Sequence, residues 1–392
     1  MSRVLVINSG SSSVKYRLFD GDETVAKGIV DRIGEPGSPV ADHDQALRQI
    51  LDQLDLAGLA AVGHRVVHGG LRFTEPTRID DDVLAEVTAL VPLAPLHNPP
   101  NLAGIRATRA LLPGVPQVAV FDTAFHRTLP EAAATYAIDA QVARNHGIHR
   151  YGFHGTSHAY VSRRTAELLG RTPAEVNVIT LHLGNGASAC AVAGGRSVAT
   201  SMGLTPLEGL VMGTRSGDLD PAVIFHLYRT AGMSVDDLDH LLNFRSGLYG
   251  LAGHNDMRAL LAARAAGDGA AALAFDVYCR RITAYVGAYY ALLGRVDAVT
   301  FTAGVGENAA EVRAAALAGL ERLGISVDPE RNRVNAPVIS PDGAEVAVCV
   351  VPTDEEKEIA RQALAVAAAT PTPSATNPPA ANPPTANPPA AE

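Results

Sequence analysis

The stretch VLVINSGSSSVKYRLFDGD, residues 4–22, carries the strongest structural signal in this 392-residue chain. A β-rich run, Val4–Ile7, ends in a loop of Asn, Gly and Ser, and a second run, Val14–Phe19, ends in an Asp-Gly hairpin turn. The stretch VITLHLGNGASACAVAGGR, residues 178–196, repeats this order in the second half of the chain. We predict a duplicated domain, with a small-residue loop from each half facing the other.

The rest of the chain alternates short apolar runs with helical patterns. Further strands are predicted at Ala61–Val67, Gln117–Phe121, Val176–Leu183, Ala187–Val192, Asp297–Thr302 and Val346–Val351. Helices are predicted at Gln45–Leu56, Val83–Leu90, Ser157–Leu169, Ala270–Leu293 and Glu355–Ala368. Strands that alternate with helices indicate an α/β fold.

Composition excludes several classes of protein. The chain is 47% hydrophobic, enough for a sizeable core, and its length suggests two domains. It has 32 Lys and Arg against 41 Asp and Glu, which argues against nucleic acid as a partner. We find no apolar run near the ~20 residues of a membrane span and expect no signal peptide. The three cysteines lie far apart, which excludes a disulfide framework and fits a reducing cytoplasm: Cys190, Cys279 and Cys349.

The C-terminal segment has a different composition. Eight of the 25 prolines follow Thr370, in a repeat of ANPP with a single charge and no aliphatic residue larger than Ala. Such a segment buries too little surface to become ordered. We therefore expect residues 371–392 to form a disordered tail, and we favour this interpretation over a ligand for a proline-binding domain.

Ligands of open α/β sheets bind beyond the carboxyl ends of the strands. The predicted strands end in the segments NSGSSS, GHRVVHGG, FDTAFH, HLGNGAS, TAGVGEN and PTDEE. These segments hold most of the unusual residues of the chain. We expect them to converge on one functional site.

Three of these segments are small-residue loops that suit phosphate groups. Asn8–Lys15 offers backbone amides, Ser hydroxyls and one of only three lysines, although it is not a Walker A loop. Gly184–Ser188 is a second loop, in which Asn185 can hold a phosphate oxygen; an ordinary turn is the alternative for both. Gly304–Ala309 matches GxGxxA, but no acidic residue ends a strand ~20 residues later. We favour a turn against adenosine or phosphate over a dinucleotide fold.

Two arginines and three oxygen-bearing side chains stand in or beside these ends. Arg65 lies in an apolar strand and needs a carboxylate or anionic partner, and Arg215 lies in a glycine-flanked loop. As a pair they suit a carboxylate or phosphoryl group, with ordinary salt bridges as the alternative. Asp122 can act as a base, orient water or a metal, or cap a helix. Asn8 and Glu355 offer oxygen ligands that suit Mg²⁺.

Nine of the 13 histidines lie between His64 and His182. Their spacing raises a zinc site, which we disfavour because HExxH and nearby cysteines are absent. The GTSH segment raises a Ser–His hydrolase, but the GxSxG elbow is absent. His154 instead suits a donor of a hydrogen bond to developing charge.

Taken together, the loops resemble the acetate kinase family. The matching segments run in order over residues 1–370: VLVINSGSSSVKY, GHRVVHGG, PLHNPPN, FDTAFH, RYGFHGTSH, HLGNGAS, TPLEGLVMGTRSGDLDP, FTAGVGEN and PTDEE. The resemblance implies duplicated actin-like (ribonuclease H-like) ATPase domains around a central cleft, as in sugar kinases, heat-shock chaperones and actin. We expect residues 1–150 with the C-terminal helix 356–369 to form one domain, and residues 151–355 the other.

The resemblance implies reversible transfer of a phosphoryl group from ATP to acetate, giving acetyl phosphate and ADP, in a cytoplasmic homodimer joined through the second domain. Arg65 would hold the acyl carboxylate, and Asp122 would be the active-site acid. His154 and Arg215 would stabilise the transition state. Because acetate is already ionised at neutral pH, we interpret Asp122 as an orienter of an arginine or of Mg²⁺-bound water rather than a proton acceptor.

The resemblance also implies binding residues. Magnesium, with Mn²⁺ as an alternative, would be held by Asn8 and Glu355. A small apolar pocket for the methyl group would be lined by Val67, Leu96, Phe153 and Pro206. The phosphates of ATP would lie near Ser11, Ser13 and Lys15. The rest of ATP would be bound by His182, Leu183, Gly184, Asn185, Gly186, Asp256, Met257, Arg258, Gly304, Val305, Gly306, Glu307 and Asn308.

Two departures from the family pattern leave questions open. Asp354 stands where family members usually carry Asn, which leaves metal preference open, and the segment Gly28–Leu54 is shorter than usual. A propionate or other short-chain acyl kinase is an alternative, because one methylene is worth only ~1–3 kcal/mol. A chaperone-like or actin-like ATPase and a non-catalytic nucleotide-binding module are more distant alternatives, since no peptide-binding domain follows the fold.

Overall fold

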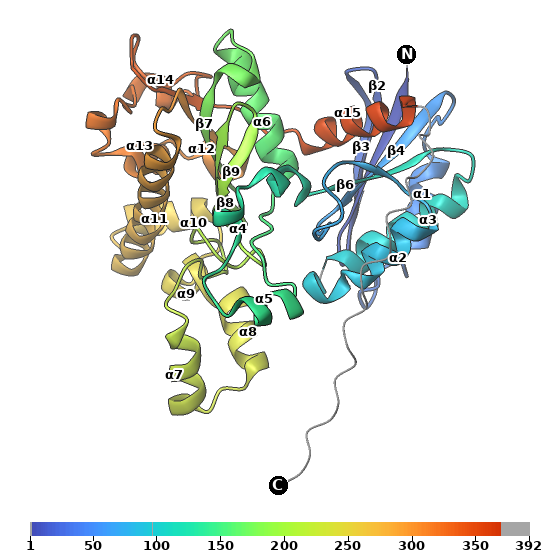
Figure 1. The fold of residues 1–392 in the computed structure, drawn as a ribbon, viewed down its shortest axis with the longest axis horizontal. Coiled ribbons are helices and arrows are strands. Elements are labelled where there is room, and N and C mark those ends of the chain that lie inside the picture. Colours follow the sequence, from blue (N-terminus) through green and yellow to red (C-terminus); the bar gives the residue numbers. More distant parts are fainter. Residues whose placement is uncertain (1, 96, 370–392) are drawn as a thin grey trace.

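The structure is a computed structural model that describes residues 2–95 and 97–369. Two of our sequence predictions, Leu96 in the methyl pocket and the tail at 371–392, lie outside the described residues. The described chain forms two β-sheets with helices on their faces (Figure 1). No helix among the described residues is both long and apolar enough to cross a membrane.

The first sheet comes from the N-terminal part of the chain. Its strand order is β3-β2-β1-β4-β6-β5. The strands are β1 (Arg3–Ser9), β2 (Val14–Asp20), β3 (Glu23–Val30), β4 (Leu59–Val66), β5 (Thr77–Arg78) and β6 (Gln117–Phe121). Strands β1, β4 and β6 run parallel, and β1–β2 is an antiparallel hairpin in which Asn8 lies opposite Lys15.

The second sheet repeats this topology. Its strand order is β11-β10-β7-β8-β9. The strands are β7 (Asn177–Leu183), β8 (Ala187–Ala193), β9 (Arg196–Thr200), β10 (Ala298–Thr302) and β11 (Ala347–Val350). Strand β7 again forms an antiparallel hairpin with β8 and runs parallel to β10, as β10 does to β11. The two similar sequence stretches, residues 4–22 and 178–196, therefore form equivalent hairpins. The predicted duplication and α/β fold are confirmed.

Helices connect and cover the sheets. They are α1 (His43–Asp52), α2 (Asp81–Ala89), α3 (Asn98–Leu111), α4 (Glu131–Ala134), α5 (Ala140–Asn145), α6 (Gly155–Leu168), α7 (Ala222–Ala231), α8 (Val235–Phe244), α9 (Gly247–Ala252), α10 (Met257–Ala265), α11 (Gly269–Leu293), α12 (Ala303–Asn308), α13 (Ala310–Leu317), α14 (Pro329–Arg333) and α15 (Glu355–Ala368). Gly304–Asn308, which we predicted as a turn after a strand, lies in the short helix α12 that directly follows β10.

Alternating residues of β1 explain why both faces of the first sheet are covered. Leu5 and Ile7 pack with α1, whereas Val4 and Val6 pack with Ile359 of α15. A strand buried on both faces is apolar along its whole length, which is the pattern of the sequence VLVI. The first sheet thus requires a helix from the far end of the chain.

One helix crosses between the halves. Helix α6 lies between the two sheets in sequence and precedes β7, and its Val161 and Ala166 pack with strands of the second sheet. Helix α15 follows the second sheet but packs on the first (Figure 1). The two helices meet, and Arg163 Nη2 donates to Glu358 Oε2 at 2.9 Å. The first half therefore depends on a helix from the C-terminal end of the chain.

Candidate active site

Side chains from distant strand ends meet at Asp122, the residue that follows β6. Arg65, near the end of β4, donates from Nη2 to Asp122 Oδ2 at 2.6 Å and from Nε to both carboxylate oxygens at 3.1 Å. Glu355, the first residue of α15, lies 3.7 Å from the same Nε. The predicted convergence of these strand ends is thus present, and a buried carboxylate fixes the plane of the Arg65 guanidinium.

The charges of this cluster are mutually dependent. Burial raises the pKa of Glu355 to about 7, an effect that Arg65 opposes and Asp122 reinforces. Burial also lowers the pKa of Arg65, but Asp122 and Glu355 outweigh this and raise the pKa above its ordinary value. One guanidinium therefore faces two carboxylates. When both carboxylates are ionised, a further positive charge nearby would stabilise the cluster.

The main chain of Asp122 is fixed by the start of α6. Gly155 donates its N–H to the Asp122 carbonyl at 2.9 Å, and a Cβ on Gly155 would collide with that same oxygen. The neighbouring Thr156 donates its hydroxyl to Asp122 Oδ1 at 3.4 Å. Only glycine allows α6 to begin this close to the strand end.

His154 lies just before α6 in a left-handed conformation, with φ of 57°. For a residue other than glycine this conformation is strained, and such strain concentrates at functional sites. Its ring stacks on that of His182 with 4.2 Å between centroids, and its Nδ1 lies 2.9 Å from Ser188 Oγ. Burial first, and then neighbouring histidines and arginines, hold the pKa of His154 well below its usual range. The imidazole is therefore neutral in the free protein.

Arg215 approaches His154 from the second half of the chain. A Cβ placed on Gly186 would lie 3.6 Å from Arg215 Nη2 and 3.6 Å from His154 Nε2, so both groups flank this loop residue. Arg215 Nη1 donates to the Pro206 carbonyl at 2.9 Å. Arg215 Nη2 and His154 Nε2 therefore both lie close to Gly186, in the small loop after β7.

A cavity of about 750 Å³ adjoins this loop. Of the residues predicted to bind ATP, it is lined by Gly184, Asn185, Asp256, Met257, Arg258, Gly304, Val305 and Asn308. Gly213 in its wall lies so close to Asn185 that a Cβ there would collide with Asn185 Oδ1. The cavity lies between α10, α12 and the β7–β8 loop, and its size suits a nucleoside.

Other predicted ATP residues do not line the cavity. Leu183 is buried in the core of the second sheet, and His182 faces Ser157 at 2.8 Å. The Gly306 carbonyl accepts from the buried Arg313 at 2.9 Å. Glu307 Oε1 accepts from the Ala303 N–H at 2.8 Å and the Thr353 N–H at 3.1 Å. These groups position the loops around the cavity.

The remaining predicted residues lie at the edge of the cluster. Lys15 is exposed on β2 and lowers the pKa of Glu355, and Ser11 is exposed in the β1–β2 loop. Ser13 and Asn8 are half-buried in the same hairpin. Val67 and Phe153 are buried together in one apolar cluster, and Pro206 is half-buried.

The sequence analysis missed several residues of the site. His97 belongs to the quoted segment PLHNPPN but received no role; burial lowers its pKa, and Arg215 and Arg65 lower it further, which places it beside both. Ser188 and Thr353 also carry hydroxyls into the histidine cluster. Only the position of these residues in strand-end segments could have indicated them.

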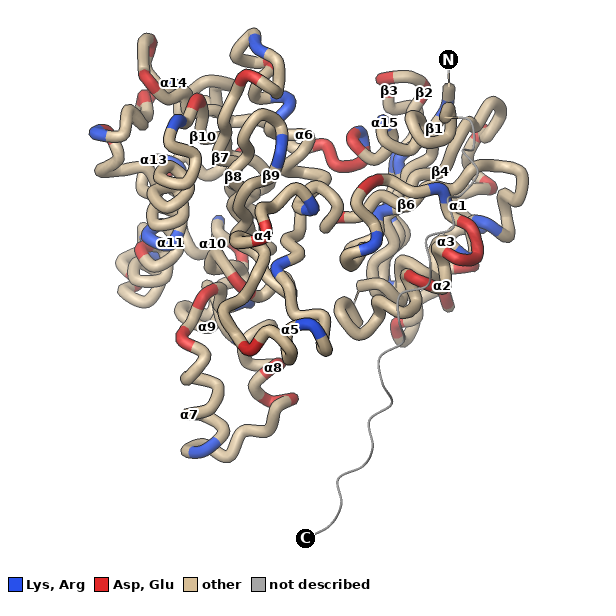
Figure 2. The backbone as a smooth tube through the Cα atoms, in the orientation of Figure 1, with Lys and Arg blue, Asp and Glu red and all other residues tan. Residues whose placement is uncertain are grey.

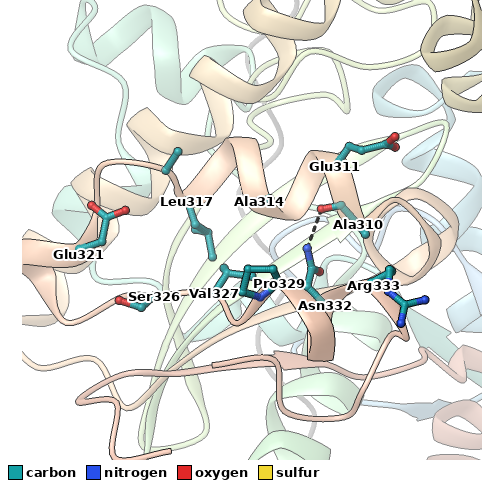
Figure 3. Close-up of a pocket in the computed structure, with 11 residues that line it drawn as sticks. Ala310, Glu311, Ala314, Leu317, Glu321, Ser326, Val327, Pro329, Asn332 and Arg333 are labelled. Carbon is teal, nitrogen blue, oxygen red and sulfur yellow. Dashed lines mark hydrogen bonds between the residues drawn. The ribbon is translucent and has the colours of Figure 1, made fainter. Parts of the chain in front are cut away.

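Two other observations delimit the site. Among residues 2–95 and 97–369 no group of three or more His, Cys, Asp or Glu is arranged to hold a metal ion. A separate hollow of about 350 Å³ lies between α13 and α14, where Asn332 donates to the Ala310 carbonyl at 2.8 Å (Figure 3). It is lined largely by apolar groups and contains none of the predicted site residues.

The chain is similar to proteins of one known family. The sequence model described as the acetokinase family matches residues 3–361. The chain is 63% identical to an acetate kinase of Streptomyces avermitilis, covering 93% of this chain and 97% of that protein. The solved acetate kinase of Porphyromonas gingivalis superposes with a TM-score of 0.90 at 42% identity, over 93% of this chain and all of the other. A propionate kinase from Francisella tularensis gives 0.87 at 40% identity, over 92% and 99%.

Proposed function

The chain belongs to the acetokinase family, and on this premise we propose that it transfers the γ-phosphoryl group of ATP reversibly to acetate, giving acetyl phosphate and ADP. The observation that carries the proposal is the meeting of Arg65, His154 and Arg215 beside a nucleoside-sized cavity. Phosphoryl transfer depends on positioning and charge neutralisation, which these groups are suited to supply.

We assign the acyl group to Arg65. Asp122 engages Nε and Nη2, whereas Nη1 has no hydrogen bond to any described residue and is free for a carboxylate. The buried Val67 and Phe153 offer an apolar surface for the methyl group. Asp122 then acts as a positioning residue that holds the guanidinium, in agreement with a substrate that needs no base.

We assign the transferred phosphoryl group to the space beside Gly186. Arg215 Nη2 and His154 Nε2 both approach the Cβ position of Gly186, so they can contact different equatorial oxygens of the transition state. The nucleoside would occupy the cavity lined by Asn185 and α12, and its phosphates would extend toward Gly186. Donors held in place before the reaction stabilise charge without reorganisation.

The acidic cluster fits a divalent cation. Two carboxylates, Asp122 and Glu355, face the single guanidinium of Arg65, and the pKa of Glu355 is raised. One more positive charge would therefore stabilise this site. We propose that Glu355 and Asn8 hold Mg²⁺, or Mn²⁺, which when bound would neutralise phosphate charge. Asp354 is already engaged, since its Oδ1 accepts from Arg17 Nη1 at 2.7 Å and from the Lys357 N–H at 2.9 Å. The departure from Asn at this position therefore adds no free carboxylate.

A second copy of this chain is the proposed macromolecular partner. Helix α7 has no buried residue, and Phe225 and Tyr228 on it are 56% and 60% exposed. It extends from the second half of the molecule (Figure 1). Exposed apolar side chains on such a helix suit a homodimer interface. We expect Phe225→Asp to convert a dimer to monomers in analytical ultracentrifugation; an unchanged mass would contradict this interface.

Other partners and location follow from the same features. Lys and Arg are scattered among Asp and Glu along the backbone in the view of Figure 2, and the sequence has 41 acidic against 32 basic residues, which argues against a nucleic-acid partner. All three cysteines are buried free thiols. We propose a cytoplasmic location on this chemistry.

One assay tests the activity and its acyl specificity. The full-length protein is incubated with ATP, Mg²⁺, hydroxylamine and acetate, propionate or butyrate, and the acyl hydroxamate is measured. We expect the highest kcat/KM with acetate and no product from Arg215→Ala. A preference of ~10-fold or more for propionate would move the assignment to that acyl kinase, which a neighbour of known structure exemplifies. Product from none of the three acids would refute the proposal.

A further inference from the structure

A chain of buried hydroxyl and imidazole groups runs from the second sheet to His154. His154 Nδ1 lies 2.9 Å from Ser188 Oγ, which lies 2.7 Å from His158 Nε2. His158 Nδ1 in turn lies 2.7 Å from Thr180 Oγ1. Ser188, His158 and Thr180 are fully buried, so water does not interrupt the series.

The direction of these hydrogen bonds is set by Thr180, the group farthest from His154 in the series. The Thr180 hydroxyl has two acceptors within reach, the Cys190 carbonyl at 3.4 Å and His158 Nδ1 at 2.7 Å, and only the second is within the usual range for a hydroxyl donor. We take the shorter contact as the one to which Thr180 donates, which leaves the proton of the His158 imidazole on Nε2. His158 then donates to Ser188, and Ser188 donates to His154 Nδ1. The proton of a neutral His154 is consequently on Nε2.

We infer that Ser188, His158 and Thr180 are positioning residues that hold His154 in its Nε2–H tautomer, so that its proton faces the transferred phosphoryl group. The inference rests on the proposed role of His154. The opposite tautomer would present a lone pair to anionic oxygens. Nε2 makes no hydrogen bond to a described residue and lies beside Gly186, where Arg215 also approaches. This series of hydrogen bonds gives a physical reason why a serine, Ser188, follows the residues GNGA.

The surroundings of His154 support a neutral ring whose tautomer matters. His182 stacks on it, His158 lies behind Ser188, and Arg65 and Arg215 are the cations that face it. All of these oppose a second proton on the ring. The ring must therefore donate as a neutral imidazole, for which the choice of nitrogen is decisive.

The first experiment measures the tautomer in the intact wild-type protein. Long-range ¹H–¹⁵N spectra of ¹⁵N-histidine-labelled protein, assigned with His154→Gln and His158→Gln, distinguish the two nitrogens of each ring. We expect both residues as Nε2–H tautomers. A proton on Nδ1 of His154 would overturn the inference, even if His154→Gln abolishes activity and so upholds its catalytic role.

The second experiment removes one hydroxyl at a time and measures kinetics. Thr180→Val and Ser188→Ala should lower kcat by roughly 10- to 100-fold, the loss typical when the group orienting a functional imidazole is removed, with little change in KM for ATP. Thr180→Ser should restore kcat, because it restores the hydroxyl. The pH dependence of kcat should change in Thr180→Val, because the tautomer is released.

Matched controls separate orientation from loss of packing. Thr165→Val removes a buried hydroxyl of α6 that bonds Val161 and Thr300, and Ser197→Ala removes one on β9 that bonds His126. Both controls should keep kcat within about 2-fold of wild type while losing similar stability. Equal kcat in Thr180→Val and Thr165→Val would overturn the inference.

Discussion

Replacing Asp122 by Asn tests whether this residue acts by holding Arg65. The change keeps the shape of the side chain but removes the charge that accepts three contacts from the guanidinium, at 2.6–3.1 Å. Removing one partner of a buried ion pair costs about 3–5 kcal/mol. Glu355, at 3.7 Å, still compensates part of the charge, so we take the lower end, about 3 kcal/mol. If this is lost from the transition state, kcat/KM for acetate falls roughly 100-fold.

The hydroxamate assay with varied acetate measures this loss, and thermal unfolding measures the accompanying loss of stability. Asp297→Asn is the matched control, because Asp297 accepts from Arg171 Nη1 at 2.8 Å away from the site. We expect the control to lose stability without a change in KM for acetate. An Asp122→Asn enzyme with near-normal kcat/KM would refute the assignment of Asp122 as the residue that positions Arg65.

Three further predictions concern pH, packing and metal. Burial lowers the pKa of His64 to about 4, so the folded protein keeps it neutral; its contribution to stability is complete above pH 6.5 and is lost as pH falls toward 4. His64→Asn should therefore show a smaller drop in Tm between these pH values, and a parallel drop would contradict this. Gly155→Ala should destabilise by about 1–3 kcal/mol in urea and lower kcat, since the new methyl displaces Asp122; unchanged unfolding would show that α6 can shift. Asp354→Asn should leave the Mg²⁺ and Mn²⁺ dependence of activity unchanged, because Arg17 already neutralises that carboxylate; a change in metal preference would show that it reaches the metal.

The central strands of both sheets were predictable because they are apolar along their length and end in glycine-rich segments. Strand β3 was not, since it lies at the sheet edge and most of its residues, such as Lys27 and Glu23, are exposed. Burial creates the periodic signal, and an edge strand that is little buried carries little of it. The segment with α7 was also missed, although its apolar residues recur with a helical period.

For the site, sequence indicated the chemistry of Arg65 and Asp122 but not their contact. A strand-end arginine and a strand-end aspartate, 57 residues apart, become partners only because β4 and β6 are neighbours. His158, the histidine of the GTSH segment, was considered for a zinc site and for a Ser–His hydrolase, yet its ring bonds Ser188 and Thr180. Tertiary contacts of this kind leave no local pattern in the sequence.

The packing of α15 on the first sheet has a consequence for synthesis on the ribosome. One face of the first sheet, with Val4 and Val120, is covered by Ile359 of α15. The ribosome must add more than two hundred residues after β6 before that helix exists, which at 5–20 residues per second takes on the order of 10–50 s. The nascent N-terminal half therefore exposes an apolar sheet face during translation and is a natural client for chaperones until the C-terminus emerges.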